Sequence, residues 1–220
     1  LDSAFLAQLV VEKGLETHSQ ASIGSADIRQ FFDTIPVLHV IQLLILKGYN
    51  RGLAAAILAV QMFPRIDLKC LGTQVSVRNR SIGGLTGSSL AGVLGMALVS
   101  DVVAQRAESW RSIGFRFGDH CISMSVWVDN AFAYARSSYA AIEILRMFES
   151  ELVTRWNLAI KESSREYLMC TNLQDDIREV EGQVWKKCVI LKVLGHLIAS
   201  DGGVRQEWLE TVPKMWAVFY

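Results

Sequence analysis

The chain has 220 residues, of which 51% are hydrophobic and 20% charged, so it can bury one substantial core. Its 22 basic and 22 acidic side chains give a formal net charge of zero, which argues against an autonomous nucleic-acid-binding domain of the usual basic kind. The cysteines are not closely paired, unlike those of zinc sites and small disulfide scaffolds. We therefore expect reduced thiols without a disulfide partner, in an intracellular protein. The cysteines are Cys70, Cys121, Cys170 and Cys188.

The first third of the chain alternates between helical and strand patterns. Residues 3–16 favour an amphipathic helix, and the segment after them shifts to a short strand ending near Asp27. Two further helices follow, the first from Pro36 to a stop at Gly48 and the second capped by Asn50. The alternating stretch "RIDLKCLGTQVSV" then predicts a hairpin.

Residues 81–100, "SIGGLTGSSLAGVLGMALVS", carry no charge over the length of a bilayer span. Five of these residues are glycine, which makes the segment weakly hydrophobic for a membrane helix. A Gly/Ser-rich turn that leads into a buried helix, ending near Trp110, explains the composition better. We expect no membrane partner.

The stretch "SVWVDNAFAYA" at residues 125–135 places Asp129 and Asn130 between two strand-like segments. A turn at Asp129 and Asn130, forming a polar hairpin tip, is the simpler interpretation. A metal ligand at that tip is the alternative, because Asp27 ends another predicted strand, and neighbouring antiparallel strands would bring the two carboxylates to one edge. Magnesium usually needs only one or two protein carboxylates.

The remaining segments complete a mixed pattern of helices and strands. An amphipathic helix begins after Ser137 or Ser138, and "EYLMC" and "CVILKVLGHLI" each predict one strand, the second followed by a turn at "SDGG". The order of elements indicates an α+β fold in which helices cover one face of an antiparallel sheet. Residues 1–203 form one domain in this interpretation, and 204–220 begin another.

Five short motifs occur in one order across residues 27–203. They are "ADIRQFFDTIP", which contains Asp27, Phe32 and Asp33, then "SIGGLTGSSLAGVL", "VWVDNAFAYA", "WNLAIKESSREYL" and "KVLGHLIASDG". In this order the chain resembles the palm of reverse transcriptases, which are RNA-directed DNA polymerases, and among them the non-LTR (LINE-type) retroelement enzymes. The resemblance implies a polymerase palm with a ferredoxin-like core, with partial fingers within 1–203 and the start of a thumb or connection in 204–220.

The resemblance also implies roles for individual residues. Asp27 and Asp129, with Asn130 beside them, would hold two Mg²⁺ (or Mn²⁺) ions for nucleotidyl transfer, and Lys161 would act near the pyrophosphate. Phe32 would be the steric gate against a ribose 2′-hydroxyl. Thr86 and Gly87 would line the nucleotide pocket. The implied partners are an RNA or DNA template-primer and deoxynucleoside triphosphates, and the implied location is the nucleus.

The sequence departs from the family pattern at several positions. Asn130 replaces the second Asp of the hairpin, Thr86 stands where the family has Gln, and the basic fingers that precede the first motif are absent from the chain. We therefore expect a divergent, N-terminally truncated member. Two alternatives stay open: a catalytically silent palm that serves as a nucleic-acid or protein scaffold, and an unrelated α+β protein. Asp27 as a helix cap and Lys161 as a solvated lysine are the corresponding structural interpretations.

Overall fold

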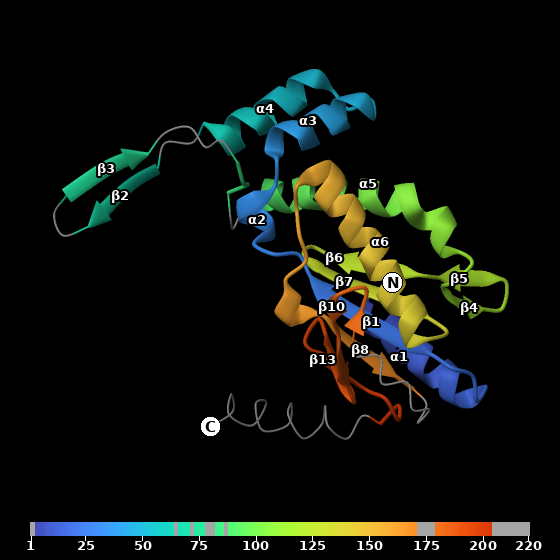
Figure 1. Cartoon of the computed structure of the whole chain (residues 1–220). Helices are drawn as coiled ribbons and strands as arrows, with labels where there is room; N and C mark the ends of the chain where they lie inside the picture. Colours follow the sequence, from blue (N-terminus) through green and yellow to red (C-terminus); the bar gives the residue numbers. More distant parts are fainter. Residues whose placement is uncertain are drawn as a thin grey trace, which may run out of the picture.

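A five-stranded sheet forms the centre of the computed structural model, which describes residues 3–63, 66–70, 73–77, 82–85, 88–170 and 179–203 (Figure 1). The strand order is β11-β8-β1-β7-β6. The central strand β1 pairs antiparallel with β7 and β8, whereas β11 runs parallel to β8. The predicted α+β fold is confirmed, with a sheet that is mixed rather than wholly antiparallel. The strands are β1 (Ser22–Asp27), β6 (Met124–Trp127), β7 (Asn130–Ala135), β8 (Glu166–Met169) and β11 (Lys186–Cys188).

Side-chain alternation along β7 decides what packs on each face of the sheet. Its three alanines face one side, where their small side chains admit helix α6, with α5 packed beside it. Phe132 and Tyr134 face the other side, in a second core with helix α1 and the β12–β13 hairpin. The sequence predicts helices on one face of the sheet, and α5 and α6 form that layer. Helix α1 covers the opposite face, which was not predicted. The bounds are α1 (Ser3–Glu16), α5 (Ser89–Trp110), α6 (Ser138–Trp156), β12 (Ile190–Val193) and β13 (His196–Ala199).

The segment between β1 and α5 forms a layer beyond the end of the sheet. Helices α3 and α4 pack on each other and on α5, and the β2–β3 hairpin reaches away from them (Figure 1). Asn50 caps α4 as predicted, because its Oδ1 accepts a hydrogen bond of 3.1 Å from Leu53 N. The bounds are α2 (Phe31–Thr34), α3 (Val37–Leu46), α4 (Arg51–Met62), β2 (Ile66–Cys70) and β3 (Thr73–Val77).

Helix α5 contains the uncharged stretch. Within the described residues it is the one helix long and apolar enough to cross a membrane, by length and composition alone. The structure uses it as a core helix, since Leu94, Leu98 and Val102 are fully buried against the sheet side of the protein. Gly95 allows Phe31 of α2 to approach, because a Cβ at this position would lie 2.6 Å from the Phe31 ring. These contacts agree with the predicted buried helix.

One predicted turn and one predicted strand differ from the observed structure. The tip of the β6–β7 hairpin is Val128 and Asp129, with Val128 at φ 58°, whereas Asn130 already pairs with Trp127 as the first residue of β7. "CVILKVLGHLI" is not one strand, because Leu194 and Gly195, at φ 50° and 93°, turn the chain between β12 and β13. Positive φ at both central residues is typical of the type I′ hairpin turn, and an apolar Leu gives no sequence signal for it.

The remaining predictions at the level of whole segments have mixed outcomes. Ser137 caps α6, and its Oγ accepts from Ala140 N at 3.2 Å. The predicted boundary between 203 and 204 stays a prediction, because residues 204–220 lie outside the described part of the chain. Cys121, Cys170 and Cys188 are free thiols, and burial raises the pKa of Cys170 and Cys188 to about 12. The short elements are β4 (Phe115–Phe117), β5 (His120–Ile122), β9 (Glu179–Val180), β10 (Gln183–Val184) and the 3-10 turn η1 (Glu162–Ser164).

Candidate active site

Asp27 and Asp129 meet at one end of the central sheet. Asp27 is the last residue of β1 and lies directly opposite Asn130 in the antiparallel register, while Asp129 occupies the adjoining hairpin tip. The backbone N–H of Ile28 donates to the carbonyl of Asp129 at 2.7 Å, which fixes the tip against β1. Opposed residues of an antiparallel pair project from the same face, so the side chains of Asp27 and Asn130 share one side of the sheet. The predicted meeting of the two acids is thus present in the backbone geometry.

The electrostatics of Asp27 reflect this crowding. Partial burial raises the pKa of the Asp27 carboxyl, and the negative charges of Asp129 and Glu166 raise it further. Lys161 acts in the opposite direction, because its positive charge lowers the same pKa. A second positive charge at this place, such as a divalent cation, would relieve the repulsion between the carboxylates.

Asn130 contacts its neighbour in the hairpin. Its Nδ2 donates a hydrogen bond of 3.0 Å to Asp129 Oδ1. The amide therefore orients the Asp129 carboxylate without adding charge, and its own Oδ1 has no hydrogen-bond partner among the described residues. An Asn at this position supplies one neutral oxygen donor to the site.

Lys161 is held beside Asp27 through the backbone. Its N–H donates to the Asp27 carbonyl at 2.8 Å, and Ser164 Oγ accepts from Asp27 N at 2.9 Å while donating to the Lys161 carbonyl at 2.6 Å. An isolated bridge between Ile28 and Ile160 continues this pairing. Lys161 is exposed, as the structural interpretation expects, and its positive charge lowers the pKa of Asp27. Its role near the pyrophosphate stays a prediction.

A buried polar cluster behind Lys161 was missed by the sequence reasoning. Glu149 of α6 accepts two hydrogen bonds from Arg165 Nη2, at 3.0 and 3.1 Å, one from Gln183 Nε2 at 3.0 Å, and one from Ile160 N at 3.2 Å. It thereby anchors both ends of the segment that carries Lys161. A signal was present in the sequence, because Glu149 lies on the apolar face of its helix between Phe148 and Leu152.

The nucleotide-pocket predictions are only partly covered by the described residues. Phe32 lies on α2, immediately after the Asp27 segment, with its ring centroid 5.5 Å from that of Phe31 and its side chain partly buried against the core. The N–H of Gly84 donates to the Phe32 carbonyl at 2.7 Å, so the second motif lies against the first. Thr86 and Gly87 lie outside the described residues.

A second residue missed by sequence reasoning supports the same loop. Gln61 of α4 is fully buried, and its Oε1 accepts from Leu85 N at 2.8 Å while its Nε2 donates to Ser88 Oγ at 3.2 Å. It therefore links α4 to the segment that enters α5. A single Gln near the end of an apolar helix gives little sequence signal for such a role.

The donor set can be compared with what a metal ion requires. No group of three or more His, Cys, Asp or Glu side chains with metal-binding geometry occurs in the part of the chain that the structure describes. Magnesium usually binds proteins through one or two carboxylates and takes its other ligands from water and substrate phosphate. Asp27 and Asp129, with the Asn130 oxygen, fit that requirement, and they do not form an all-protein cage.

No protein-family model matches the chain, and no curated protein matches it either. Solved telomerase structures are similar in fold. Apo telomerase from Candida tropicalis, truncated from its C-terminal domain, aligns with a TM-score of 0.64 at 11% identity, over 91% of this chain and 39% of that one. Telomerase from Candida albicans and from Candida tropicalis, each in complex with a TWJ fragment of telomeric RNA, give TM-scores of 0.63 and 0.65 at 10% identity.

These neighbours establish the fold. The two RNA-bound structures are matched over 90% of this chain and 34% and 32% of theirs, so the chain spans about a third of their length. Telomerase catalytic subunits are reverse-transcriptase-like, and the predicted palm-type fold is confirmed.

Proposed function

We propose that the chain is the palm of a reverse-transcriptase-like nucleotidyltransferase of the non-LTR type, which extends a primer along an RNA or DNA template with deoxynucleoside triphosphates. One observation carries the proposal. Asp27 at the end of β1 and Asp129 at the β6–β7 tip lie on adjoining strands, with the Asp129 carbonyl bonded to Ile28 N at 2.7 Å. A palm-type fold with two carboxylates at this end of its central strands suits two-metal phosphoryl transfer.

The side chains have separate roles in this proposal. Asp27 and Asp129, with the Asn130 oxygen, would hold Mg²⁺ or Mn²⁺, which when bound activates the primer 3′-hydroxyl and stabilises the leaving pyrophosphate. Lys161, fixed to Asp27 through its N–H, offers positive charge to the departing phosphates. Phe32 would exclude a ribose 2′-hydroxyl from the nucleotide site, and Thr86 and Gly87 would line the pocket.

Primer extension by the purified chain with Mn²⁺ or Mg²⁺ tests the proposal. Asp27→Asn should lower the rate roughly 100-fold or more, because a metal ion contributes several kcal/mol to the stabilisation of the transition state. Asp119→Asn is the matched control, since it removes the same charge from an exposed turn between β4 and β5. Equal activity in Asp27→Asn and the unmodified chain would contradict the proposal.

Asn130 favours a second candidate function, a palm that binds nucleic acid or protein as a scaffold without catalysis. Its amide replaces the charge of a metal-binding carboxylate and engages Asp129 Oδ1 at 3.0 Å. A scaffold should bind single-stranded RNA equally in EDTA and in Mn²⁺, and Mn²⁺ should not bind to Asp27. We propose a nuclear site of action for either function, which imaging of a tagged chain tests.

A further inference from the structure

An open hollow of about 710 Å³ lies at the other end of the sheet from Asp27. It is formed by the end of α1 with the residues after it, by β4 and its turn, and by the residue that follows β7. Figure 1 shows the end of α1 and the β4–β5 hairpin on the same side of the molecule, away from α2. Arg136 lies six residues along the chain from Asn130, which at 3.3 Å per residue of strand is about 20 Å.

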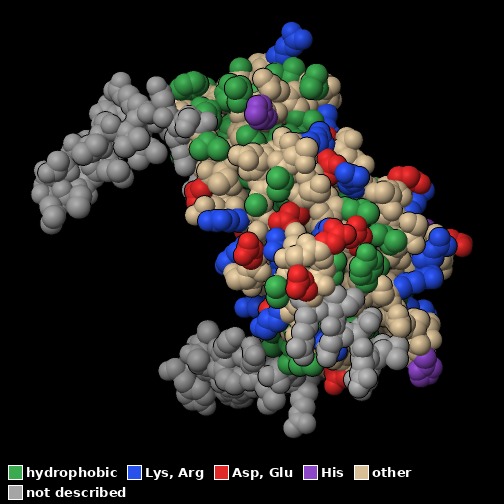
Figure 2. All heavy atoms as spheres, viewed as in Figure 1, with side chains coloured by type: hydrophobic (Ala, Val, Ile, Leu, Met, Phe, Trp, Pro, Cys, Tyr) green, Lys and Arg blue, Asp and Glu red, His purple; other side chains and the backbone are tan. Residues whose placement is uncertain are grey.

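Three cations line the hollow: Lys13, Arg116 and Arg136. Lys13 forms an ion pair with Glu16 at 2.7 Å, so part of its charge is already neutralised. Arg116 and Arg136 are exposed and form no ion pair with any residue that the structure describes. Asp119, in the turn after β4, is the nearest acid in sequence to Arg116. Figure 2 shows Lys and Arg side chains, with Asp and Glu side chains among them, on this side of the molecule.

Strand pairing holds the backbone next to both arginines. Arg116 lies opposite Cys121 in the β4–β5 ladder, and a bridge between Gly114 and Ala135 joins this hairpin to the end of β7, one residue before Arg136. The two backbones are therefore held next to each other. The planar guanidinium group of arginine can bind phosphate in bidentate fashion.

The polar floor of the hollow adds no competing charge. Thr17 Oγ1 donates to the Lys13 carbonyl at 2.7 Å and lies 2.6 Å from Ser19 Oγ, so both hydroxyls are engaged locally. Free binding capacity thus resides in the two arginines. The chain as a whole is neutral, so this local excess of positive charge does not follow from general basicity.

We propose that this hollow binds the phosphodiester backbone of a single-stranded nucleic acid, with Arg116 and Arg136 each contacting a phosphate and Lys13 supplementing them. The choice of nucleic acid among phosphate-bearing ligands rests on the proposed function. The hollow is wider than one phosphate needs, and its cations come from separate elements, which suits an extended polyanion. The site is distinct from the carboxylate site and needs no divalent metal.

Binding of a fluorescently labelled single-stranded RNA, measured by anisotropy in EDTA over a range of salt concentrations, tests the proposal. Arg116→Ala/Arg136→Ala should weaken binding roughly tenfold at low salt and reduce the slope of log K against log salt by about 1.4, which corresponds to two phosphate contacts on a single strand. The RNA affinity of Arg116→Lys/Arg136→Lys should lie between those of the unmodified chain and the double alanine variant, because lysine keeps the charge and loses the bidentate guanidinium geometry.

Arg51→Ala/Lys192→Ala is the matched control, with the same loss of charge at exposed positions on α4 and β12. Equal weakening in the control would reduce the effect to net charge and overturn the proposal. Unchanged RNA affinity in Arg116→Ala/Arg136→Ala would also overturn the proposal. The same variant should be tested with vesicles that contain phosphatidylserine, and a loss of vesicle binding without a loss of RNA binding would overturn it too. RNA binding is measured in EDTA and therefore does not depend on a metal ion. A failure of primer extension would contradict the proposed function and leave the proposed RNA site intact.

Discussion

Asn130 determines how much negative charge the candidate site carries. It lies opposite Asp27 and donates to Asp129 Oδ1, so in the proposed metal site it would be a third oxygen ligand without a charge. Two divalent cations bring four positive charges, and the number of charged ligands tunes how tightly such ions bind. The site as it stands should therefore bind metal weakly.

Asn130→Asp should increase Mn²⁺ affinity roughly tenfold, because a third carboxylate joins the site. In the metal-free protein the same change should raise the pKa of Asp27 further, by repulsion across the strand pair. A Mn²⁺ titration followed by EPR measures the first effect, and ¹³C NMR of the Asp27 carboxyl measures the second. Asn50→Asp is the control, since it adds the same charge at a helix cap where Asp serves as well as Asn. An unchanged Mn²⁺ affinity would mean that Asn130 does not face the ion.

Asp27→Asn should make the metal-free protein more stable at neutral pH. The folded-state pKa of Asp27 is raised, chiefly by burial, so between the unfolded and folded pKa values the folded state holds more proton than the unfolded chain. Stability therefore falls as pH rises through that window, and the amide variant avoids the loss. Urea denaturation at a series of pH values should show the gain at pH 7 and none below the unfolded pKa of Asp. The reverse dependence on pH, with a gain in stability only in acid, would contradict a raised pKa of Asp27 in the folded state.

At the scale of elements, the sequence predicts the periodic parts well. The helices over residues 3–16 and 138–156, the strand ending at Asp27 and the cap at Asn50 all follow from hydrophobic period and cap chemistry. The sequence does not predict the tips of the β6–β7 and β12–β13 hairpins, because Val128 and Leu194 adopt positive φ, which β-branched and bulky residues disfavour. Tertiary pairing of the flanking strands imposes those angles, and local sequence does not encode them.

The candidate site shows the same division. Asp27 and Asp129 could be paired because each lies at the end of a predicted strand, and Lys161 could be proposed from the resemblance of its motif to that of reverse transcriptases. Glu149, Arg165 and Gln183 could not, because their partnership joins a helix, a loop and a later strand. The one sequence signal for this cluster is Glu149 itself, an acid on the apolar face of α6.

Glu149→Leu should lower the free energy of unfolding by about 3 kcal/mol, because it leaves the buried Arg165 guanidinium without its partner. Urea denaturation measures the loss. Glu143→Leu on the same helix is the control, since its pair with Arg146 is more exposed, and it should cost less than about 1 kcal/mol. The double variant Glu149→Leu/Arg165→Met should recover part of the loss, as expected when an unpaired charge dominates the cost. No recovery would mean that Glu149 stabilises the fold mainly through Ile160 N and Gln183 Nε2.

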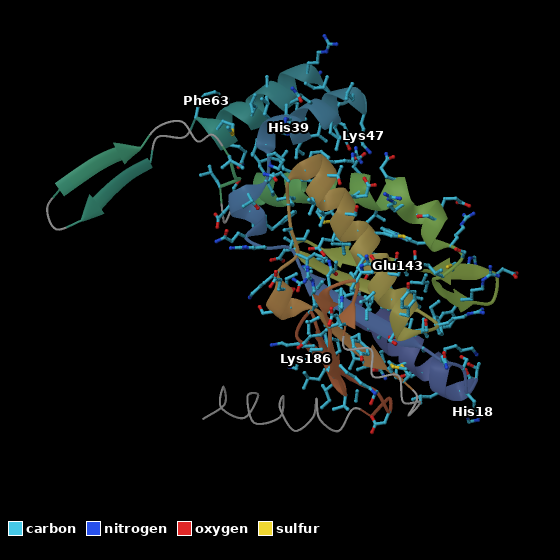
Figure 3. All side chains as sticks on the ribbon, in the orientation of Figure 1. His18, His39, Lys47, Phe63, Glu143 and Lys186 are labelled. Carbon is cyan, nitrogen blue, oxygen red and sulfur yellow. The ribbon has the colours of Figure 1, made fainter. Side chains whose placement is uncertain are left out.

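At the scale of the whole molecule, one buried acid connects the α3–α4 layer to the helices on the sheet. Asp101 of α5 binds Lys47, the residue directly after α3, at 3.1 Å through Oδ1 and Arg155 of α6 at 2.8 Å through Oδ2. Its side chain is 5% exposed, whereas Lys47 and Arg155 are 43% and 37% exposed. Figure 3 shows Lys47 on the side of α3 that faces α5. Asp101 therefore ties α5 to the end of α3 and to α6.

Asp101→Asn should cost about 1–3 kcal/mol, because a neutral amide satisfies neither cation while remaining buried. Lys47 and Arg155 can be solvated by water in the variant, so the loss of stability should be largest where α3 packs on α5. Hydrogen exchange should accelerate in α3 and stay unchanged in α1, which packs on the opposite face of the sheet in a separate core. Glu108→Gln, on the same helix but in an exposed pair with Arg111, should change neither. Equal acceleration in α1 and α3 would show that Asp101 supports the whole core, and the α3–α4 layer would then have no separate attachment through this residue.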